Sequence, residues 1–189
     1  SYQVSIEDAI RNAGRLIKES GADSVKLEGG LDYAPTVKAI VKAGIPVMGH
    51  IGLTPQTAGS LGGFKVQGKD AKAAQNLIDS AIALEDAGAF AIVLECIPAP
   101  LAKIISQKLT IPTIGIGAGV YCDGQVLVTQ DMLGLFDRFV PKFVKQYAQI
   151  GQLELEAFNK YAEEVALGVF PDDAHSFSMK EEVIKQLEY

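Results

Sequence analysis

Residues 90–96 read Phe-Ala-Ile-Val-Leu-Glu-Cys, and this segment gives the clearest strand prediction in the chain. Five apolar residues followed directly by glutamate predict a short strand at 90–94 that ends at Glu95. The strand shows no alternation of polar and apolar residues, so both of its faces are expected to be covered. That is typical of a parallel sheet with helices packed outside it.

The same alternation of strand and helix continues from this stretch in both directions. Ser5 is placed to cap a helix at its start, and Gly21, Gly44 and Gly88 stand where left-handed glycines end helices. The pattern predicts strands at 24–27, 46–48, 90–94, 112–116, 125–128 and 143–147, and helices at 6–20, 36–43, 74–85, 100–109, 153–167 and 179–187.

The spacing of the strands favours a barrel. One strand begins at residue 24 and the next at 46, and the pair at 90 and 112 repeats that interval. A constant strand-helix period favours an α/β fold of the (β/α)8 TIM-barrel type, with an open doubly wound sheet as the alternative. Five or six strands fall short of eight, and the chain falls short of the ~250 residues typical of such barrels. We therefore expect one incomplete barrel domain over 1–189, with C-terminal helices at about 153–189.

Composition excludes several classes of protein. The 189 residues carry 17 Lys+Arg against 23 Asp+Glu, a net charge of −6. That balance argues against binding nucleic acid through bulk positive charge. No apolar run reaches the ~18 residues that predict a membrane span, so no membrane partner is expected. Two cysteines cannot form a disulfide framework and no signal peptide is evident, so a cytoplasmic location is expected.

A glycine-rich interval between residues 50 and 69 breaks the regular period. It is far longer than the ~2–6 residues usual between a strand and a helix. One interpretation is a surface loop with a small hairpin around 64–66. The other is a lid over a site at the strand ends, and the sequence leaves both open.

Polar residues follow directly on the apolar strands. Glu28, His50, Glu95 and the turn at 115–119 each stand at a strand end. The carboxyl ends of parallel strands face one crevice, so we expect these residues to meet there. The turn lacks both a full dinucleotide fingerprint and a P-loop lysine, which makes it a weak phosphate signal.

Each of these side chains has a chemical and a structural interpretation. Glu95 ends the most apolar strand, where lost solvation makes a carboxylate a better base, or where it pairs with a buried lysine. Glu28 can hold Mg²⁺ while Lys26 pairs with an anionic substrate, or the two form a structural ion pair. His50 can donate a hydrogen bond or act as an acid, or it is a satisfied structural histidine.

Six segments carry a resemblance to a known family. They are VKLEGG (25–30), GIPVMGHIGLTPQ (44–56), FKVQGK (64–69), LECIP (94–98), TIGIGAG (113–119) and DGQVLVTQDMLG (123–134). Together, in this order and spacing, the chain resembles the ketopantoate hydroxymethyltransferase family from about Ser1 to its C-terminal end. The likeness implies a TIM barrel of the phosphoenolpyruvate/pyruvate type.

The resemblance also implies a reaction. Members transfer a hydroxymethyl group from 5,10-methylenetetrahydrofolate to 3-methyl-2-oxobutanoate, giving 2-dehydropantoate for pantothenate and coenzyme A biosynthesis. One Mg²⁺ per subunit stabilises an enolate of the oxo acid. By this likeness Glu95 is the general base, Glu28 a metal ligand, and Lys26 and His50 bind substrate. Family members form homo-oligomers, often decamers.

The chain departs from the family at its start. Members have roughly 70–80 more residues there, which accounts for the barrel deficit. By the resemblance, that part carries two strands, two metal-site aspartates and a substrate-binding serine. We therefore expect a fragment whose activity alone is open. A noncatalytic chain, or another metal-dependent oxo-acid lyase of the same barrel type, are the alternative interpretations.

Overall fold

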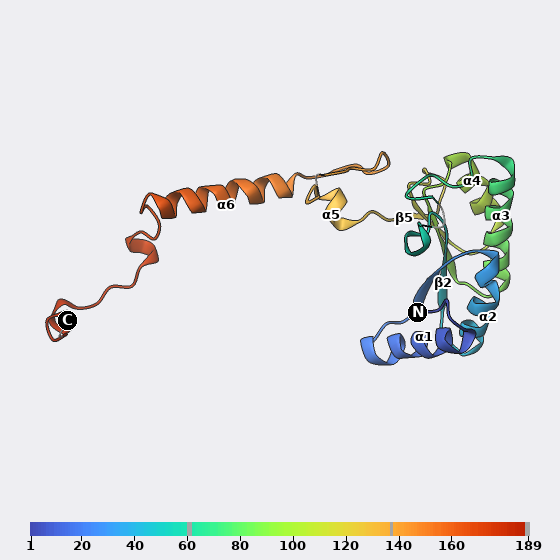
Figure 1. Ribbon diagram of the computed structural model, residues 1–189, viewed down its shortest axis with the longest axis horizontal. Helices are drawn as coiled ribbons and strands as arrows, with labels where there is room; N and C mark the ends of the chain where they lie inside the picture. Colours follow the sequence, from blue (N-terminus) through green and yellow to red (C-terminus); the bar gives the residue numbers. More distant parts are fainter. Residues whose placement is uncertain (60–61, 137, 188–189) are drawn as a thin grey trace. The chain divides into compact units, whose positions relative to one another are not determined.

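The computed structural model describes residues 1–59, 62–136 and 138–187. The chain divides into two compact units, Ser1–Leu127 and Val128–Tyr189 (Figure 1). The first unit holds the sheet and its helices, and the second holds short helices and one long one. The single barrel domain expected over 1–189 stays a prediction.

The first unit is a parallel sheet with helices between its strands. Its strands are β1 (Val25–Glu28), β2 (Val47–Gly52), β3 (Ala91–Glu95), β4 (Thr113–Ile116) and β5 (Gly124–Gln125), and its helices are α1 (Ile6–Ser20), α2 (Ala34–Lys42), α3 (Ala71–Asp86) and α4 (Ala99–Lys108). Two short 3₁₀ helices, η1 (Leu31–Tyr33) and η2 (Pro55–Thr57), follow β1 and β2.

The order of the strands identifies the fold type. Every strand pairs in parallel with the next one along the chain, in the order β1-β2-β3-β4-β5. A doubly wound sheet reverses its order at a switch point, and no reversal occurs among the described strands. The barrel-type prediction is therefore confirmed, as a partial barrel whose five strands do not close.

Helix α1 forms where the sequence predicts it, and its two ends show why. The Ser5 hydroxyl accepts a hydrogen bond from the backbone N–H of Asp8 at 3.1 Å, which satisfies a free donor of the first turn. Gly21 ends the helix in the left-handed conformation at φ +72°. Between these caps Ala9 and Ala13 are buried against the rest of the unit.

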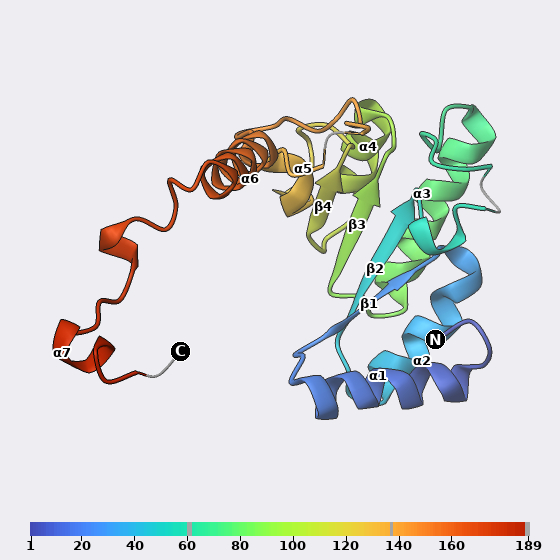
Figure 2. The ribbon, with the colours of Figure 1, turned by 60° about the vertical axis from the view of Figure 1, so that its left-hand side comes forward.

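The core lies on one face of the sheet. Helices α2, α3 and α4 run along that face (Figures 1 and 2). Leu84 of α3 lies where a Cβ on Gly49 would point, at 3.1 Å, so this face of β2 is the helix-packed one. Ile92 and Leu94 of β3 are fully buried in the same cluster. Because side chains alternate along a strand, His50 and Glu95 belong to the opposite face.

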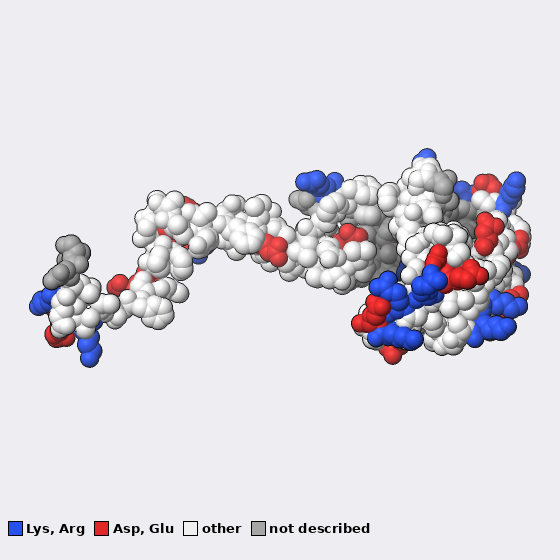
Figure 3. Space-filling view, turned by 60° about the horizontal axis from the view of Figure 1, so that its bottom comes forward, with Lys and Arg blue, Asp and Glu red and all other residues white. Residues whose placement is uncertain are grey.

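The second unit contains α5 (Thr129–Met132), α6 (Ile150–Ala166), the 3₁₀ helix η3 (Asp173–His175) and α7 (Glu181–Ile184). Helix α6 buries none of its residues, and large apolar side chains such as Phe158 and Leu167 are exposed. In the view of Figure 3, charges of both signs mix over the first unit, whereas the second shows mostly uncharged side chains.

Four predicted elements differ from the structure, and one of them is the helix at 179–187, which shrinks to Glu181–Ile184. The strand at 143–147 is wrong, because these residues follow a turn at 142–143 as irregular chain, and the N–H of Tyr147 donates to the carbonyl of Met132 at 2.7 Å. No strand forms at 64–66 among the described residues, so the hairpin is wrong too. The strand at 125–128 shrinks to Gly124–Gln125, because β4 is its one partner and Val126 and Val128 are half exposed.

Candidate active site

Four polar side chains meet at the carboxyl edge of the sheet. Lys26 and Glu28 come from β1, His50 from β2 and Glu95 from the end of β3. The strand register sets Glu28 beside His50 and Gly52 beside Glu95. The sequence therefore brings together four residues of three strands, and their chemical roles stay predictions.

A line of polar contacts runs through His50. Lys26 Nζ lies 3.0 Å from His50 Nδ1, and His50 Nε2 lies 3.0 Å from Glu95 Oε2. A lysine ammonium can donate but cannot accept, so Nδ1 accepts and the ring hydrogen stands on Nε2. The imidazole thus turns its N–H toward the Glu95 side of the site.

His50 keeps one unused hydrogen-bonding group. Its side chain is 4% exposed, and Nε2 has no aligned partner among the residues that the structure describes, because the N–H does not point along the line to the Glu95 oxygen. A buried donor without an acceptor is costly and rare. Glu95 is 15% and Lys26 44% exposed, so both reach solvent or a ligand. His50 Nε2 is thus a buried donor beside the Glu95 carboxylate.

Glu28 is held from three directions. Its Oε2 accepts from the backbone N–H of Gln56 at 3.0 Å, and its Oε1 lies 3.7 Å from both Lys26 Nζ and His50 Nδ1. Its backbone carbonyl accepts from the Tyr2 hydroxyl at 2.8 Å. Burial raises the pKa of Tyr2, and the charge of Glu28 adds to the rise. Tyr2 and Gln56 are not predicted from the sequence, because contacts between distant segments leave no local signal.

The long connection between β2 and α3 contributes backbone donors to these strand ends. The N–H of Gln56 donates to Glu28, as described above. The N–H of Gln67 donates to the carbonyl of Cys96 at 2.9 Å. Residues 60–61 of this connection lie outside the described residues. Its role as a lid stays a prediction.

The glycine turn after β4 serves packing. A Cβ on Gly119, at φ +80°, would collide with Ala99. A Cβ on Gly115 would approach Cys122 Sγ and Gln125 Oε1 to 3.0 Å, and Gln125 Nε2 donates to the Gly119 carbonyl at 2.9 Å. These contacts explain two of the glycines without a phosphate ligand.

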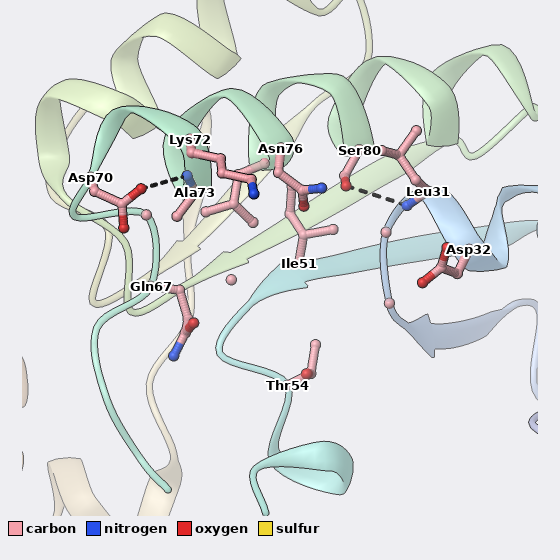
Figure 4. Close-up of a pocket in the computed structure, with 15 residues that line it drawn as sticks. Leu31, Asp32, Ile51, Thr54, Gln67, Asp70, Lys72, Ala73, Asn76 and Ser80 are labelled. Atoms are coloured by element: carbon pink, nitrogen blue, oxygen red, sulfur yellow. Dashed lines mark hydrogen bonds between the residues drawn. The ribbon is translucent and has the colours of Figure 1, made fainter. Parts of the chain in front are cut away.

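A cavity of about 530 Å³ opens at the same edge, on the α3 side of β1 and β2 (Figure 4). Its lining includes Gly29, which directly follows β1, and Gly52, the last residue of β2. Lys72 and Asn76 extend from α3 toward it, and Asp32 enters from η1. The cavity and the polar cluster therefore share strand ends while belonging to opposite faces of the sheet.

A magnesium site would need more ligands than these residues supply. Mg²⁺ takes six oxygen ligands, with one or two carboxylates common. Among the described residues, no group of three or more His, Cys, Asp or Glu side chains is placed to hold a metal. Glu28 offers one carboxylate, and Glu95 is separated from it by His50. These residues account for one ligand and do not make a magnesium site on their own.

Over the described parts of the chain, no helix combines the length and apolar composition that crossing a bilayer requires.

Comparison with known proteins identifies the relatives. The ketopantoate hydroxymethyltransferase family model matches residues 1–173. A 3-methyl-2-oxobutanoate hydroxymethyltransferase of Heliobacterium modesticaldum is 68% identical over 97% of this chain and 66% of its own length. Proteins of the same name from Clostridium beijerinckii and Enterococcus faecalis are 61% and 58% identical over 99% of the chain and 68% of theirs. The chain thus spans about two thirds of these relatives.

Proposed function

Since this chain belongs to the ketopantoate hydroxymethyltransferase family, we propose that the protein carrying it makes 2-dehydropantoate from 3-methyl-2-oxobutanoate. The hydroxymethyl group comes from 5,10-methylenetetrahydrofolate, in pantothenate biosynthesis. The observation that carries the proposal is the line Lys26–His50–Glu95 at the carboxyl edge of a barrel-type sheet, where barrel enzymes hold their reacting residues.

Glu95 is the proposed base. The C3–H bond of the oxo acid breaks, its proton passes to a Glu95 carboxylate oxygen, and its electron pair forms the enolate. Glu95 is mostly buried yet reachable, which suits proton transfer. The enolate carbon then forms a bond to the methylene carbon of the folate, and the two C–N bonds that held this carbon break to release tetrahydrofolate. Water supplies the hydroxyl oxygen of the product, and one proton from Glu95 and one from that water return to the two folate nitrogens.

His50 and Lys26 are the proposed substrate-binding groups. The unaligned Nε2–H of His50 can donate to an oxygen of the oxo acid, where it stabilises charge that develops in the enolate. The Lys26 ammonium lies beside His50 Nδ1 and is partly exposed, so it can pair with the substrate carboxylate while fixing the imidazole.

When bound, magnesium would supply a Lewis acid for the keto oxygen. Glu28 would give it one carboxylate oxygen. Its other ligands would come from the oxo acid, water or protein outside these 189 residues. We also propose that the protein is cytoplasmic and forms a homo-oligomer, a decamer as in the family. The exposed apolar side chains of α6 support an oligomer.

The test is a product assay. The purified protein is incubated with 3-methyl-2-oxobutanoate, 5,10-methylenetetrahydrofolate and Mg²⁺, and the products are identified by mass spectrometry. We expect 2-dehydropantoate, and none without the folate. Folate-independent cleavage of an oxo acid would instead indicate a lyase, and no conversion with no ligand binding would indicate a noncatalytic chain. Light scattering of the same sample gives the oligomer size.

A further inference from the structure

The backbone at the end of β3 adopts an uncommon conformation. Cys96, directly after Glu95, has φ +48°, and among the described residues it is the one non-glycine residue with positive φ. This left-handed region disfavours residues with a Cβ, and the exceptions are enriched in asparagine and aspartate rather than cysteine. Such strain persists where the surrounding structure enforces it, and it clusters at functional sites.

Three hydrogen bonds from three different segments enforce the conformation. The carbonyl of Glu95 accepts from the N–H of Leu53 at 2.8 Å. The N–H of Cys96 donates to the carbonyl of Ile116 at 2.9 Å, and the carbonyl of Cys96 accepts from the N–H of Gln67, also at 2.9 Å. The donors and acceptors come from the end of β2, from β4 and from the connection whose Gln67 is labelled in Figure 4. The peptide groups on both sides of Cys96 are therefore fixed.

Because Gly52 has no side chain, the end of β2 can lie close to the backbone carbonyl of Glu95. Gly52 stands beside Glu95 in the register, with φ +93°. A Cβ at this position would collide with the Glu95 carbonyl oxygen and lie 2.8 Å from Ile97 Cγ2. The β2 end thus presses directly on the backbone that carries Glu95.

The thiol of Cys96 does not explain the residue's conformation. Burial, with the neighbouring Glu95 charge, raises the pKa of Cys96 to about 11, so the thiol stays protonated at neutral pH. A protonated thiol is a poor nucleophile and metal ligand. What distinguishes Cys96 is its backbone.

We propose that Cys96 is a positioning residue: its left-handed backbone, held by Leu53, Gln67 and Ile116 and admitted by Gly52, directs the Glu95 carboxylate toward His50. This inference rests on the proposed role of Glu95 as the base. A carboxylate displaced by about 1 Å from its substrate can lose ~10²-fold in rate, so the turn sets the rate of proton removal.

The test measures exchange of the C3 proton of 3-methyl-2-oxobutanoate in deuterated water, a step that needs no folate. Cys96→Val places a β-branched residue at positive φ, which it cannot adopt without strain. We expect its kcat for exchange to fall by about tenfold or more while KM changes less than about twofold. Cys96→Gly, which adopts the conformation freely, is the matched control and should keep exchange within about threefold of wild type.

Further variants keep the inference falsifiable if Cys96→Val fails to fold. Gly52→Ala places a methyl group against the Glu95 carbonyl and should lower kcat while leaving KM unchanged. Cys96→Ala removes only the thiol and should exchange the C3 proton at the wild-type rate. Equal losses in the glycine, alanine and valine variants would overturn the inference in favour of the thiol. Wild-type exchange in folded Cys96→Val or Gly52→Ala would overturn it as well. Unchanged exchange in Glu95→Gln would instead refute the base assignment, which separates the two failures.

Discussion

The two faces of the five-stranded sheet carry different kinds of side chain. On β3, Ile92 and Leu94 point into the helix layer and are fully buried, whereas Glu95 points to the other face and is partly exposed. On β2 the same alternation separates Gly49, under α3, from His50. Successive residues of one strand thus face different environments, because side chains alternate with a period of two.

This difference indicates a division of labour. Substitutions on the helix-packed face should lower the free energy of unfolding, and those on the polar face should lower activity. The two effects can be separated one residue apart on one strand.

The largest effect is expected for Glu95→Gln. Removing a general base should lower kcat for C3 proton exchange by about 10²–10⁴-fold. Glutamine is nearly isosteric, so the urea midpoint should stay close to wild type. Exchange kinetics by NMR and urea unfolding of one preparation check both halves. A large loss of stability in this variant would break the proposed separation of the faces.

Its neighbour Leu94→Ala should behave in the opposite way. Truncating a fully buried leucine leaves a cavity, and we expect the free energy of unfolding to fall by about 2–5 kcal/mol. Urea unfolding measures this change, and the exchange rate per folded molecule should stay within about threefold of wild type. If exchange fell as in Glu95→Gln, the helix-packed face would also contribute to the site.

The sequence predicted the helix-packed face better than the details of the polar one. Apolar runs such as 90–94 and the capped helix after Ser5 are local signals, so strands, helices and their order followed from them. The meeting of Lys26, Glu28, His50 and Glu95 followed from strand ends once the sheet was taken as parallel.

The rest depended on contacts between distant segments. The left-handed Cys96 and the donated N–H groups of Gln56 and Gln67 leave no pattern in the sequence, because backbone groups are the same in every residue. The predicted strand at 143–147 failed for a related reason. Residues such as Phe143 and Val144 favour strands, but a strand needs a partner. The N–H of Val144 instead bonds to Pro141 and that of Tyr147 to Met132, so the segment is a turn followed by irregular chain.

A smaller effect is expected at Lys26, the most exposed member of the polar cluster. Lys26→Met keeps the length of the side chain and removes its charge. We expect KM for the oxo acid to rise about tenfold, as for the loss of one charged hydrogen bond, and the unfolding midpoint to fall, because buried His50 Nδ1 loses its donor. Steady-state kinetics of the variant and the wild type measure the change in KM. A fall in kcat with constant KM would assign Lys26 to the chemical step instead of binding.

The smallest effect tests the helix-packed face at β4. Thr113 is fully buried, and its hydroxyl lies 2.8 Å from Ser106 Oγ of α4 and donates to Asp123 Oδ2 at 3.0 Å. The backbone N–H of Thr113 and then this hydroxyl lower the pKa of Asp123. A carboxyl with a lowered folded pKa contributes stability that is present above its unfolded pKa, about 4, and lost as the pH falls through the folded value.

Thr113→Val should therefore lower the urea midpoint at pH 7, because Ser106 and Asp123 each lose one hydrogen-bond partner. It should also weaken the fall in stability below pH 4, since one of the groups that lower the Asp123 pKa is gone. Urea unfolding at pH 7 and pH 3.5 gives both numbers, and Asp123→Asn is the matched control that removes the titration itself. A Thr113→Val profile parallel to wild type down to pH 3.5 would mean that the backbone N–H alone sets the Asp123 pKa, and that the hydroxyl serves only the packing of α4 on β4.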